Sequence, residues 1–263
     1  MRMNPVMQAF RDGQRTVGSW LTIPSSLNAE ILAHTGFDWL CVDMQHGMID
    51  YADAVAMFTA ISTTQTVPFV RVPWNDPGTI GKMLDAGAMG VIVPLVNNRE
   101  EAERAVAACR YPPLGFRSAG PVRARLYSGD DYLDHANDEI VVAAMIETAE
   151  GLANLDAIAS TPGLTACYIG PNDLAYAIGV TPRGDNPDPK HVATVEHILA
   201  TCKKHGIVAG IHCGGPEFAK RWLDLGFQMV MVNTDARFLT ARSADELADV
   251  RAHTGMRPVF ETK

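Results

Sequence analysis

Eight short apolar runs alternate with segments of helical periodicity along almost the whole chain, and this alternation restricts the fold more than any other feature. The runs are rich in β-branched residues and apolar on both faces, which is typical of parallel strands covered by helices. In order, they are Val17–Ile23, Trp39–Asp43, Pro68–Val72, Gly90–Val96, Ile140–Glu147, Ala166–Gly170, Val208–His212 and Met229–Asn233. The sequence therefore predicts an α/β fold built from strand–helix units.

The segments between these runs carry apolar residues at helical spacing, and turn residues mark their ends. Asp76-Pro77 and Gly215-Pro216 are typical of helix starts, whereas Gly206 and Gly226 are typical of helix ends. The predicted helices are Ala29–Ala33, Ala52–Ile61, Ile80–Ala86, Glu100–Cys109, Leu152–Ala159, Val192–Lys204, Glu217–Leu225 and Ala236–Val250.

Eight such units match one (β/α)₈ barrel, because a barrel of this type takes about 250 residues and the chain has 263. We therefore expect a single domain over residues 1–263. A doubly wound sheet is the alternative, but no Gly-x-Gly-x-x-Gly turn follows any of the runs. The longest stretch predicted to be irregular, Tyr111–Asn137, is expected to be functional because long loops in compact domains usually are.

The charge balance argues against two classes of partner. The chain has 30 acidic and 22 basic side chains and no basic block, which disfavours nucleic acid and anionic membrane surfaces as partners.

Residues 1–16 lack the apolar core of a signal peptide, and no apolar stretch is long enough to span a bilayer. The five cysteines are odd in number and show no Cys-x-x-Cys spacing, so we expect a reduced, cytoplasmic protein.

Polar and aromatic side chains gather where the predicted strands end. The carboxyl ends of barrel strands carry the active groups of such enzymes, so these side chains are expected to form one site. They are Trp20, Thr22, Asp43, Gln45, His46, Arg71, Glu147, Thr148, Asn172, Asp173, His212, Asn233 and Asp235.

Glu147 and Asp173 follow two neighbouring strands, where two carboxylates repel each other unless a cation or a shared proton separates them. An oxygen-rich pair with open positions suits Mg²⁺ or Mn²⁺. The alternative is that each carboxylate caps the helix that follows it.

A second group comprises Asp43, His46 and Arg71. An imidazole is the usual proton carrier near neutral pH, and Asp43 could fix its tautomer, with Gly47 allowing a tight turn. Alternatively, His46 is a loop residue held by local turn bonds. Arg71 ends an apolar strand, so its guanidinium must face an anionic ligand or pair with a carboxylate such as Asp43, and both can hold.

Other candidates carry a weaker signal. Trp20 could form a pocket wall or belong to the core, and His212 could be a pocket residue. Arg117 and Arg123 could contact a substrate anion or another subunit. No lysine ends an inner strand, which disfavours a Schiff-base mechanism.

At these positions the sequence resembles the HpcH/HpaI family of class II, metal-dependent pyruvate aldolases, and the resemblance covers nearly the whole chain. The matching segments are Gly18-Ser19-Trp20-Leu21, Gly36-Phe37-Asp38-Trp39-Leu40, Val42-Asp43, His46, Arg71-Val72-Pro73-Trp74-Asn75-Asp76-Pro77, Leu84-Asp85-Ala86-Gly87-Ala88, Val93-Pro94, Arg110-Tyr111-Pro112-Pro113-Leu114-Gly115-Phe116-Arg117, Ile146-Glu147-Thr148 and Ile169-Gly170-Pro171-Asn172-Asp173-Leu174.

The resemblance implies a barrel of the phosphoenolpyruvate/pyruvate superfamily that reversibly cleaves 4-hydroxy-2-oxo acids. The products would be pyruvate, or hydroxypyruvate, and an aldehyde. It further implies a divalent cation, Mg²⁺ or Mn²⁺ with Co²⁺ also possible, and no organic cofactor. The expected assembly is a homohexamer, a trimer of dimers in which the last helix is exchanged between subunits.

The same resemblance assigns roles to individual residues. Glu147 and Asp173 would hold the metal, and Arg71 would stabilise an enolate. Asp43 and His46 would form a catalytic pair, and either His46 or a hydroxide on the cation would take the proton. The remaining implied contacts are Trp20 as a pocket wall, the backbone of Gly170, Pro171 and Asn172 against the pyruvate carboxylate, and Asp85 near the metal across a subunit interface.

Two positions depart from the family pattern. Gln45 stands where family members often have glutamate, and Met145 stands where members that act on dicarboxylic substrates often have glutamine. We retain Gln45, with His212, as a candidate substrate contact. There are two alternative interpretations, namely a lyase that acts on coenzyme A thioesters and a non-catalytic barrel that binds oxo acids. Neither is favoured, because no basic patch for nucleotide phosphates is evident and the set Glu147, Asp173, Arg71 and His46 is intact.

Overall fold

The computed structural model describes residues 1–254, and within them eight parallel strands close into a barrel in sequential order. This confirms the predicted (β/α)₈ fold and excludes the doubly wound alternative, whose sheet is open. The largest boundary difference is in the fourth strand, which ends at Val93 instead of Val96. The strands are β1 (Thr16–Leu21), β2 (Trp39–Asp43), β3 (Val67–Arg71), β4 (Gly90–Val93), β5 (Val141–Ile146), β6 (Ala166–Ile169), β7 (Val208–Cys213) and β8 (Met229–Thr234).

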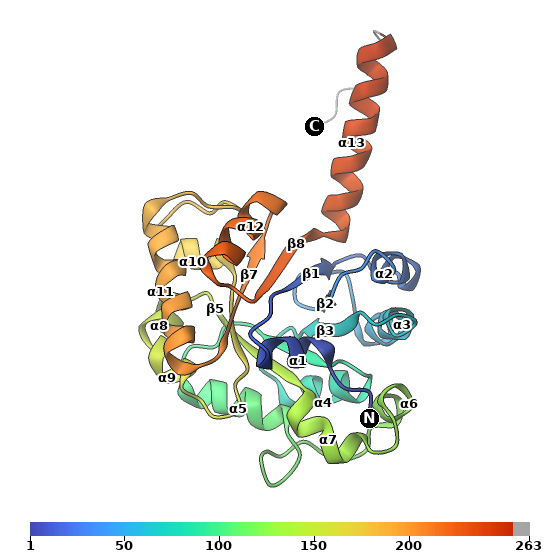
Figure 1. Ribbon diagram of the computed structural model, residues 1–263, viewed down its shortest axis with the longest axis vertical. Helices are drawn as coiled ribbons and strands as arrows, with labels where there is room; N and C mark the ends of the chain where they lie inside the picture. The colour runs from blue at the N-terminus through green and yellow to red at the C-terminus, as the bar shows by residue number, and fades with distance from the viewer. Residues whose placement is uncertain (255–263) are drawn as a thin grey trace.

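Helices surround the barrel (Figure 1). Several begin where a polar side chain accepts a backbone N–H of the first turn, which supplies a bond that the helix itself cannot. Ser25, Asp50 and Asp76 do this for α2, α3 and α4. These surrounding helices are α2 (Ser26–Ala33), α3 (Tyr51–Ile61), α4 (Pro77–Asp85), α5 (Arg99–Cys109), α8 (Ala149–Ala153), α9 (Leu155–Ala159), α10 (Pro171–Ala177), α11 (Pro189–His205) and α12 (Pro216–Leu225).

Large aromatic rings fill the barrel interior opposite glycines. A Cβ at Gly18 would lie 2.1 Å from the Trp39 ring, and one at Gly210 would lie 2.6 Å from the Tyr168 ring. These glycines therefore face inward, and residues two positions further along the same strands face inward as well. This pattern brings Trp20 of β1 and His212 of β7 into the layer at the carboxyl ends of the strands.

The stretch 111–137, predicted to be irregular, contains two short helices, and the prediction is wrong there. They are α6 (Val122–Ser128) and α7 (Tyr132–Glu139). Neither begins with a side-chain cap, and Gly129 separates them with a φ of 110°. Helices this short and uncapped leave no periodic pattern in the sequence.

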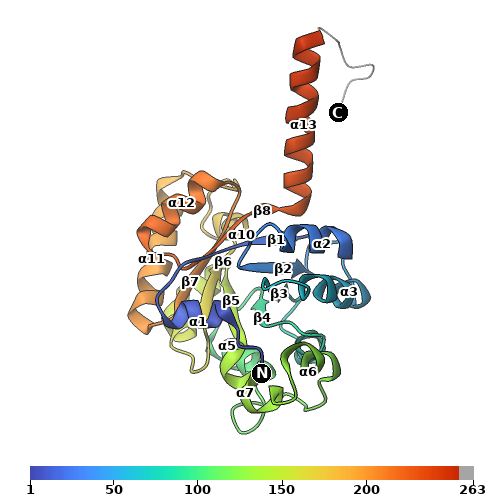
Figure 2. The same cartoon turned by 45° about the vertical axis from the view of Figure 1, so that its right-hand side comes forward.

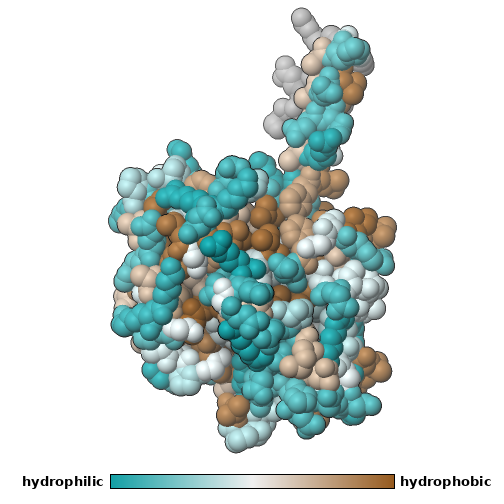
Figure 3. Space-filling view, in the orientation of Figure 1, coloured by the Kyte–Doolittle hydropathy of each residue, from teal (hydrophilic) through white to brown (hydrophobic). Residues whose placement is uncertain are grey.

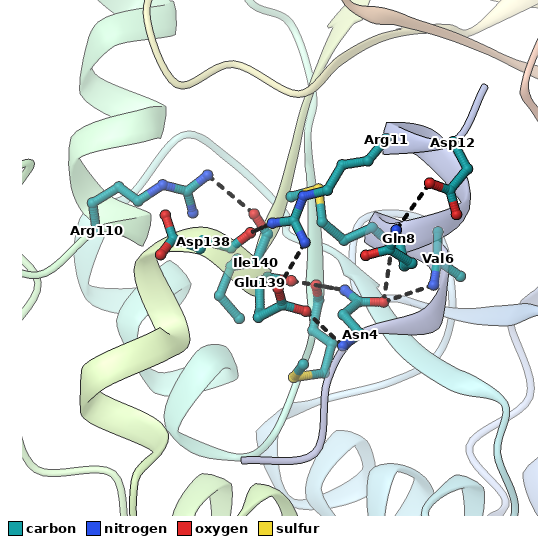
Figure 4. Close-up of polar contacts among 11 residues, drawn as sticks. Asn4, Val6, Gln8, Arg11, Asp12, Arg110, Asp138, Glu139 and Ile140 are labelled. Atoms are coloured by element: carbon teal, nitrogen blue, oxygen red, sulfur yellow. Dashed lines mark hydrogen bonds and ion pairs between the residues drawn. The ribbon is translucent and has the colours of Figure 1, made fainter. Parts of the chain in front are cut away.

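An additional helix, α1 (Pro5–Arg11), precedes the first strand and was not predicted. It is held to the start of β5 by a buried polar cluster, drawn in Figure 4. Asn4 donates from its side chain to the carbonyls of Met89 (3.0 Å) and Glu139 (2.8 Å). The Glu139 carboxylate accepts from the Asn4 backbone N–H at 2.7 Å and from Arg11 at 2.9 Å. This cluster lies at the amino ends of the strands, where barrel residues serve stability.

Replacing Glu139 by alanine is expected to lower the free energy of unfolding by about 3 kcal/mol, because it removes two bonds to a buried carboxylate. Asp138→Ala is the matched control, since that neighbouring side chain is exposed. Urea unfolding of both variants measures the effect. Equal stability of the two variants would contradict a special role for Glu139.

The last described helix, α13 (Asp235–Thr254), projects away from the barrel (Figures 1 and 2). It extends the predicted helix Ala236–Val250 at both ends, and its only buried residue is Asp235. Exposed apolar side chains gather at its base and over neighbouring α2 (Figure 3), among them Leu239, which is 62% exposed. Most helical stability in proteins comes from packing of one helix face, and α13 beyond Asp235 has no such packed face in the described residues. Residues 255–263 of the predicted domain lie outside the described part.

None of the helices in residues 1–254 is both long enough and apolar enough to cross a membrane.

Candidate active site

Asp43 and Arg71 form a buried ion pair at the carboxyl ends of β2 and β3. They are partners in the strand register. The guanidinium donates from Nε to Oδ1 at 2.8 Å and from Nη2 to Oδ2 at 2.7 Å. Two parallel bonds of this kind fix the plane of the guanidinium. The salt bridge considered as an alternative for Arg71 is therefore present, and Asp43 orients Arg71.

The loop that carries His46 is held by the same carboxylate. Asp43 Oδ1 accepts the backbone N–H groups of Gln45 (3.1 Å) and His46 (3.3 Å). A Cβ at Gly47 would lie 2.2 Å from the Asp43 carbonyl oxygen, so the tight turn requires glycine. In residues 1–254 no bond joins the Asp43 carboxylate to the exposed imidazole. Asp43 thus positions His46 through the main chain, in contrast to the expected carboxylate–imidazole contact.

Trp20 forms a wall between Arg71 and His212. Its ring is buried, and the Arg71 Cζ atom lies 4.3 Å from the ring centroid, within cation–π range. The His212 ring meets it edge-on, with centroids 5.1 Å apart. Burial and then the nearby Arg71 lower the pKa of His212 to about 4, so this imidazole is neutral at neutral pH. Trp20 is consequently both a core residue and part of the site.

Glu147 lies just past β5 and is 3% exposed. Its Oε1 accepts the backbone N–H of Leu95 at 2.9 Å, and Leu95 has a φ of 53°, in the left-handed region. Non-glycine residues seldom adopt that conformation, and such strain tends to occur at functional sites. Burial raises the pKa of Glu147, as does the neighbouring Asp173, against the opposing effect of the Leu95 N–H.

The loop after β6 brings Asp173 toward Glu147. A Cβ at Gly170 would lie 2.4 Å from Glu147 Oε2, so only glycine leaves this space to the carboxylate. Asp173 lies in the first turn of α10, where Gly170 is the N-cap residue and no side chain caps the helix, and Thr148 caps α8. Neither Glu147 nor Asp173 therefore serves as the helix cap considered as an alternative.

The two carboxylates fit a hard divalent cation. Within residues 1–254 no cluster of three or more His, Cys, Asp or Glu side chains is arranged to hold a metal. Mg²⁺ and similar ions are commonly bound by one or two carboxylates and retain several waters. Buried Glu147 and exposed Asp173, which repel each other beside the Gly170 space, meet that requirement.

The remaining predicted contacts differ in their placement. Gln45 Oε1 is buried without a hydrogen-bond partner, and Gly170 and Pro171 are buried while the Asn172 side chain is exposed. Asp85 ends α4, so in its own protomer it lies toward the amino ends of the strands, away from the other groups. There its carboxylate accepts from Arg117 at 2.7 Å.

Two arginines considered for substrate or subunit contacts are used inside the protomer. Arg117 is buried and also donates to the Tyr132 hydroxyl at 2.9 Å. Arg123 donates to Thr59 (3.0 Å) and to the Ala86 carbonyl. Both stabilise the region around α6 and α7.

Two further residues contribute to the site and were not predicted. Tyr168 packs against Trp20 with ring centroids 5.7 Å apart, and Leu95 supplies its backbone N–H to Glu147. An inward tyrosine in an apolar strand and a backbone donor leave no distinctive sequence signal.

The chain is similar in sequence and in fold to known proteins. The model of the family described as HpcH/HpaI aldolase/citrate lyase matches residues 16–241. The chain belongs to this family. A hydroxypyruvate/pyruvate aldolase from Rhizorhabdus wittichii is 40% identical over 250 residues, covering 95% of this chain and all of the relative. A 4-hydroxy-2-oxo-heptane-1,7-dioate aldolase from Salmonella dublin is 38% identical over 248 residues, covering 93% of each chain.

A crystal structure of a family member from Burkholderia cenocepacia superposes with a TM-score of 0.88 at 34% identity. It covers 94% of this chain, and this chain covers 99% of that one. Membership in the HpcH/HpaI family makes the chain a carbon–carbon lyase.

Proposed function

We propose that the chain is a divalent-metal-dependent aldolase that reversibly cleaves 4-hydroxy-2-oxo acids to pyruvate or hydroxypyruvate and an aldehyde. The observation that carries this proposal is the Arg71–Asp43 pair meeting the Glu147–Asp173 pair at one end of the barrel. The names of the relatives favour oxo acids over coenzyme A thioesters.

Glu147 and Asp173 would hold the cation, which when bound supplies a Lewis acid for the oxygens of the oxo acid. The chain's own residues do the rest. Arg71 is held rigidly by Asp43 and offers its remaining N–H donors to the oxygen on which negative charge develops. The helix start at Gly170, Pro171 and Asn172 has no side-chain cap, so the backbone N–H groups of Gly170 and Asn172 would be offered to the substrate carboxylate, whereas Pro171 has none to donate.

His46 is our candidate for the group that moves the proton. Its backbone is fixed by Asp43 and its side chain is exposed at the carboxyl end of the barrel. It would accept the C4 hydroxyl proton in cleavage and the C3 proton of pyruvate in synthesis.

The test is an aldol screen with pyruvate and hydroxypyruvate against a panel of aldehydes, repeated with Mg²⁺, Mn²⁺ and Co²⁺. Products are expected with at least one of these ions. A complete lack of product with all three ions across the panel would contradict the proposal.

We also propose that the chain assembles into a homohexamer in which α13 is exchanged between subunits, with Asp85 reaching the site of a neighbour. The exposed length of α13 supports this proposal. So does an apolar groove beside the base of that helix, lined by Val17, Leu32, Phe37 and Phe238. Five buried cysteines, none of them in a disulfide, support a cytoplasmic location.

Leu239→Glu is expected to reduce the assembly to smaller species, because the charge would enter a buried apolar contact between subunits. Sedimentation velocity measures the mass of each form. Lys220→Glu, at an exposed position on α12, is the control and should leave the mass unchanged. A wild-type chain that sediments as a monomer would refute the assembly.

A further inference from the structure

His212 faces the substrate side of the barrel without a role in the mechanism above. Tyr168 and Gly210 are register partners, and the Tyr168 ring occupies the space where a Cβ of Gly210 would lie. Gly210 therefore faces inward, and His212, two residues further toward the carboxyl end of β7, faces inward in the catalytic layer.

The catalytic layer surrounds the barrel axis. Trp20, Arg71 and His212 come from β1, β3 and β7, and Glu147 follows β5. In a sequential eight-stranded barrel these four positions alternate, so β7 lies opposite β3. His212 therefore lies across the site from Arg71, with Trp20 between them, in contact with both.

The polar side chains at this level differ in whether they have a partner. Arg71 and Asp43 satisfy each other, and Glu147 accepts the Leu95 N–H. In the described part of the chain His212 has no hydrogen-bond partner, and its side chain is partly exposed, so its ring nitrogens are not among the buried polar atoms. A ring that packs against Trp20 and keeps its nitrogens accessible can hydrogen-bond a ligand.

The charge state limits what this ligand can be. Since its pKa falls to about 4, His212 at neutral pH offers one N–H donor and one acceptor and no positive charge. Such a group suits a hydroxyl, whereas a second carboxylate would call for a cation.

We propose that His212 is a specificity-determining residue that hydrogen-bonds a hydroxyl group of the substrate, an inference that rests on the proposed aldolase function. Arg71 and the two carboxylates lie on the other sides of the site, where they would hold the enolate part of the substrate. The carbon chain beyond the enolate would therefore face β7. That hydroxyl is either the one on C3 of hydroxypyruvate or the one on C2 of a hydroxyaldehyde.

Two matched pairs of reactions separate these sources. The donor pair is hydroxypyruvate against pyruvate, each with acetaldehyde. The acceptor pair is glycolaldehyde against acetaldehyde, each with pyruvate. For one pair, His212→Leu should lower kcat/KM of the hydroxylated member about tenfold, which corresponds to one hydrogen bond, and leave the unsubstituted member within about twofold.

Further variants control for packing. His212→Phe retains a ring against Trp20 and should show the same selective loss, so the test stands even if the leucine variant does not fold. His212→Asn retains a hydrogen-bonding group and should recover part of the preference. His197→Leu, an exposed histidine on α11, should change nothing.

The outcomes distinguish failure of the proposed His212 role from failure of the proposed aldolase function. Equal effects of His212→Leu and His212→Phe on both members of both pairs, or no effect on either pair, would overturn the role of His212 while leaving the aldolase activity intact. If the wild-type protein yields no aldol product from any pair with Mg²⁺ or Mn²⁺, the aldolase function and this inference both fail.

Discussion

Replacing Arg71 by alanine is expected to lower kcat/KM for aldol cleavage by about a thousandfold, or about 4 kcal/mol of transition-state stabilisation. The guanidinium is a fixed cation, held by two bonds to Asp43, at the point where an enolate oxygen would gain charge. It is already oriented before the reaction, so its effect is largest in the transition state. Steady-state kinetics of the purified variant measure the loss.

The control must separate catalysis from folding, because Arg71→Ala leaves the Asp43 carboxylate buried without its partner. The double variant Arg71→Ala with Asp43→Asn removes that unpaired charge and should recover stability but not turnover. Arg71→Lys retains a charge but loses the planar fork, so we expect an intermediate rate. Near wild-type turnover in Arg71→Ala would remove Arg71 from the mechanism.

The second large effect is expected at Glu147. Glu147→Gln preserves the shape of the side chain and its acceptor for the Leu95 N–H, but it removes one of two charges available to a cation. We expect Mn²⁺ affinity to fall at least a hundredfold and activity to fall to background at micromolar metal. Isothermal titration calorimetry with Mn²⁺ and parallel assays provide the two readouts.

Glu150→Gln is the matched control, because Glu150 is exposed on α8 three residues away. It should bind Mn²⁺ like the wild-type protein. A Glu147→Gln protein with unchanged Mn²⁺ affinity would show that the cation, if any, binds elsewhere.

The strand–helix alternation was sufficient to predict the barrel, because parallel strands buried on both faces leave continuous apolar runs. The ends of those runs also identified Asp43, Arg71 and Glu147 as neighbours, since all the strands point the same way. Helices of conventional length with clear caps, such as α4 after Asp76, were also predicted, because their periodicity and cap residues are local features of the sequence.

Features that depend on contacts distant in sequence were missed. The helix predicted over Leu152–Ala159 is two short helices that meet at Asn154, and α1 is stabilised by Glu139 from far along the chain. The Asp43 carboxylate accepts hydrogen bonds from both Arg71 and the loop backbone. This arrangement forms only when the strands are paired in the barrel, so the local sequence does not indicate it. The strained Leu95 and the inward Tyr168 belong to the same class.

The central claim is metal-dependent formation of a pyruvate enolate at the Arg71 and Glu147–Asp173 site, and proton exchange tests it without any choice of aldehyde. In D₂O, the methyl signal of pyruvate in the proton NMR spectrum should disappear with enzyme and Mg²⁺ or Mn²⁺. It should persist with excess chelator, and also with Arg71→Ala. Exchange that continues at full rate in excess chelator, together with borohydride trapping of pyruvate on a lysine, would contradict the account.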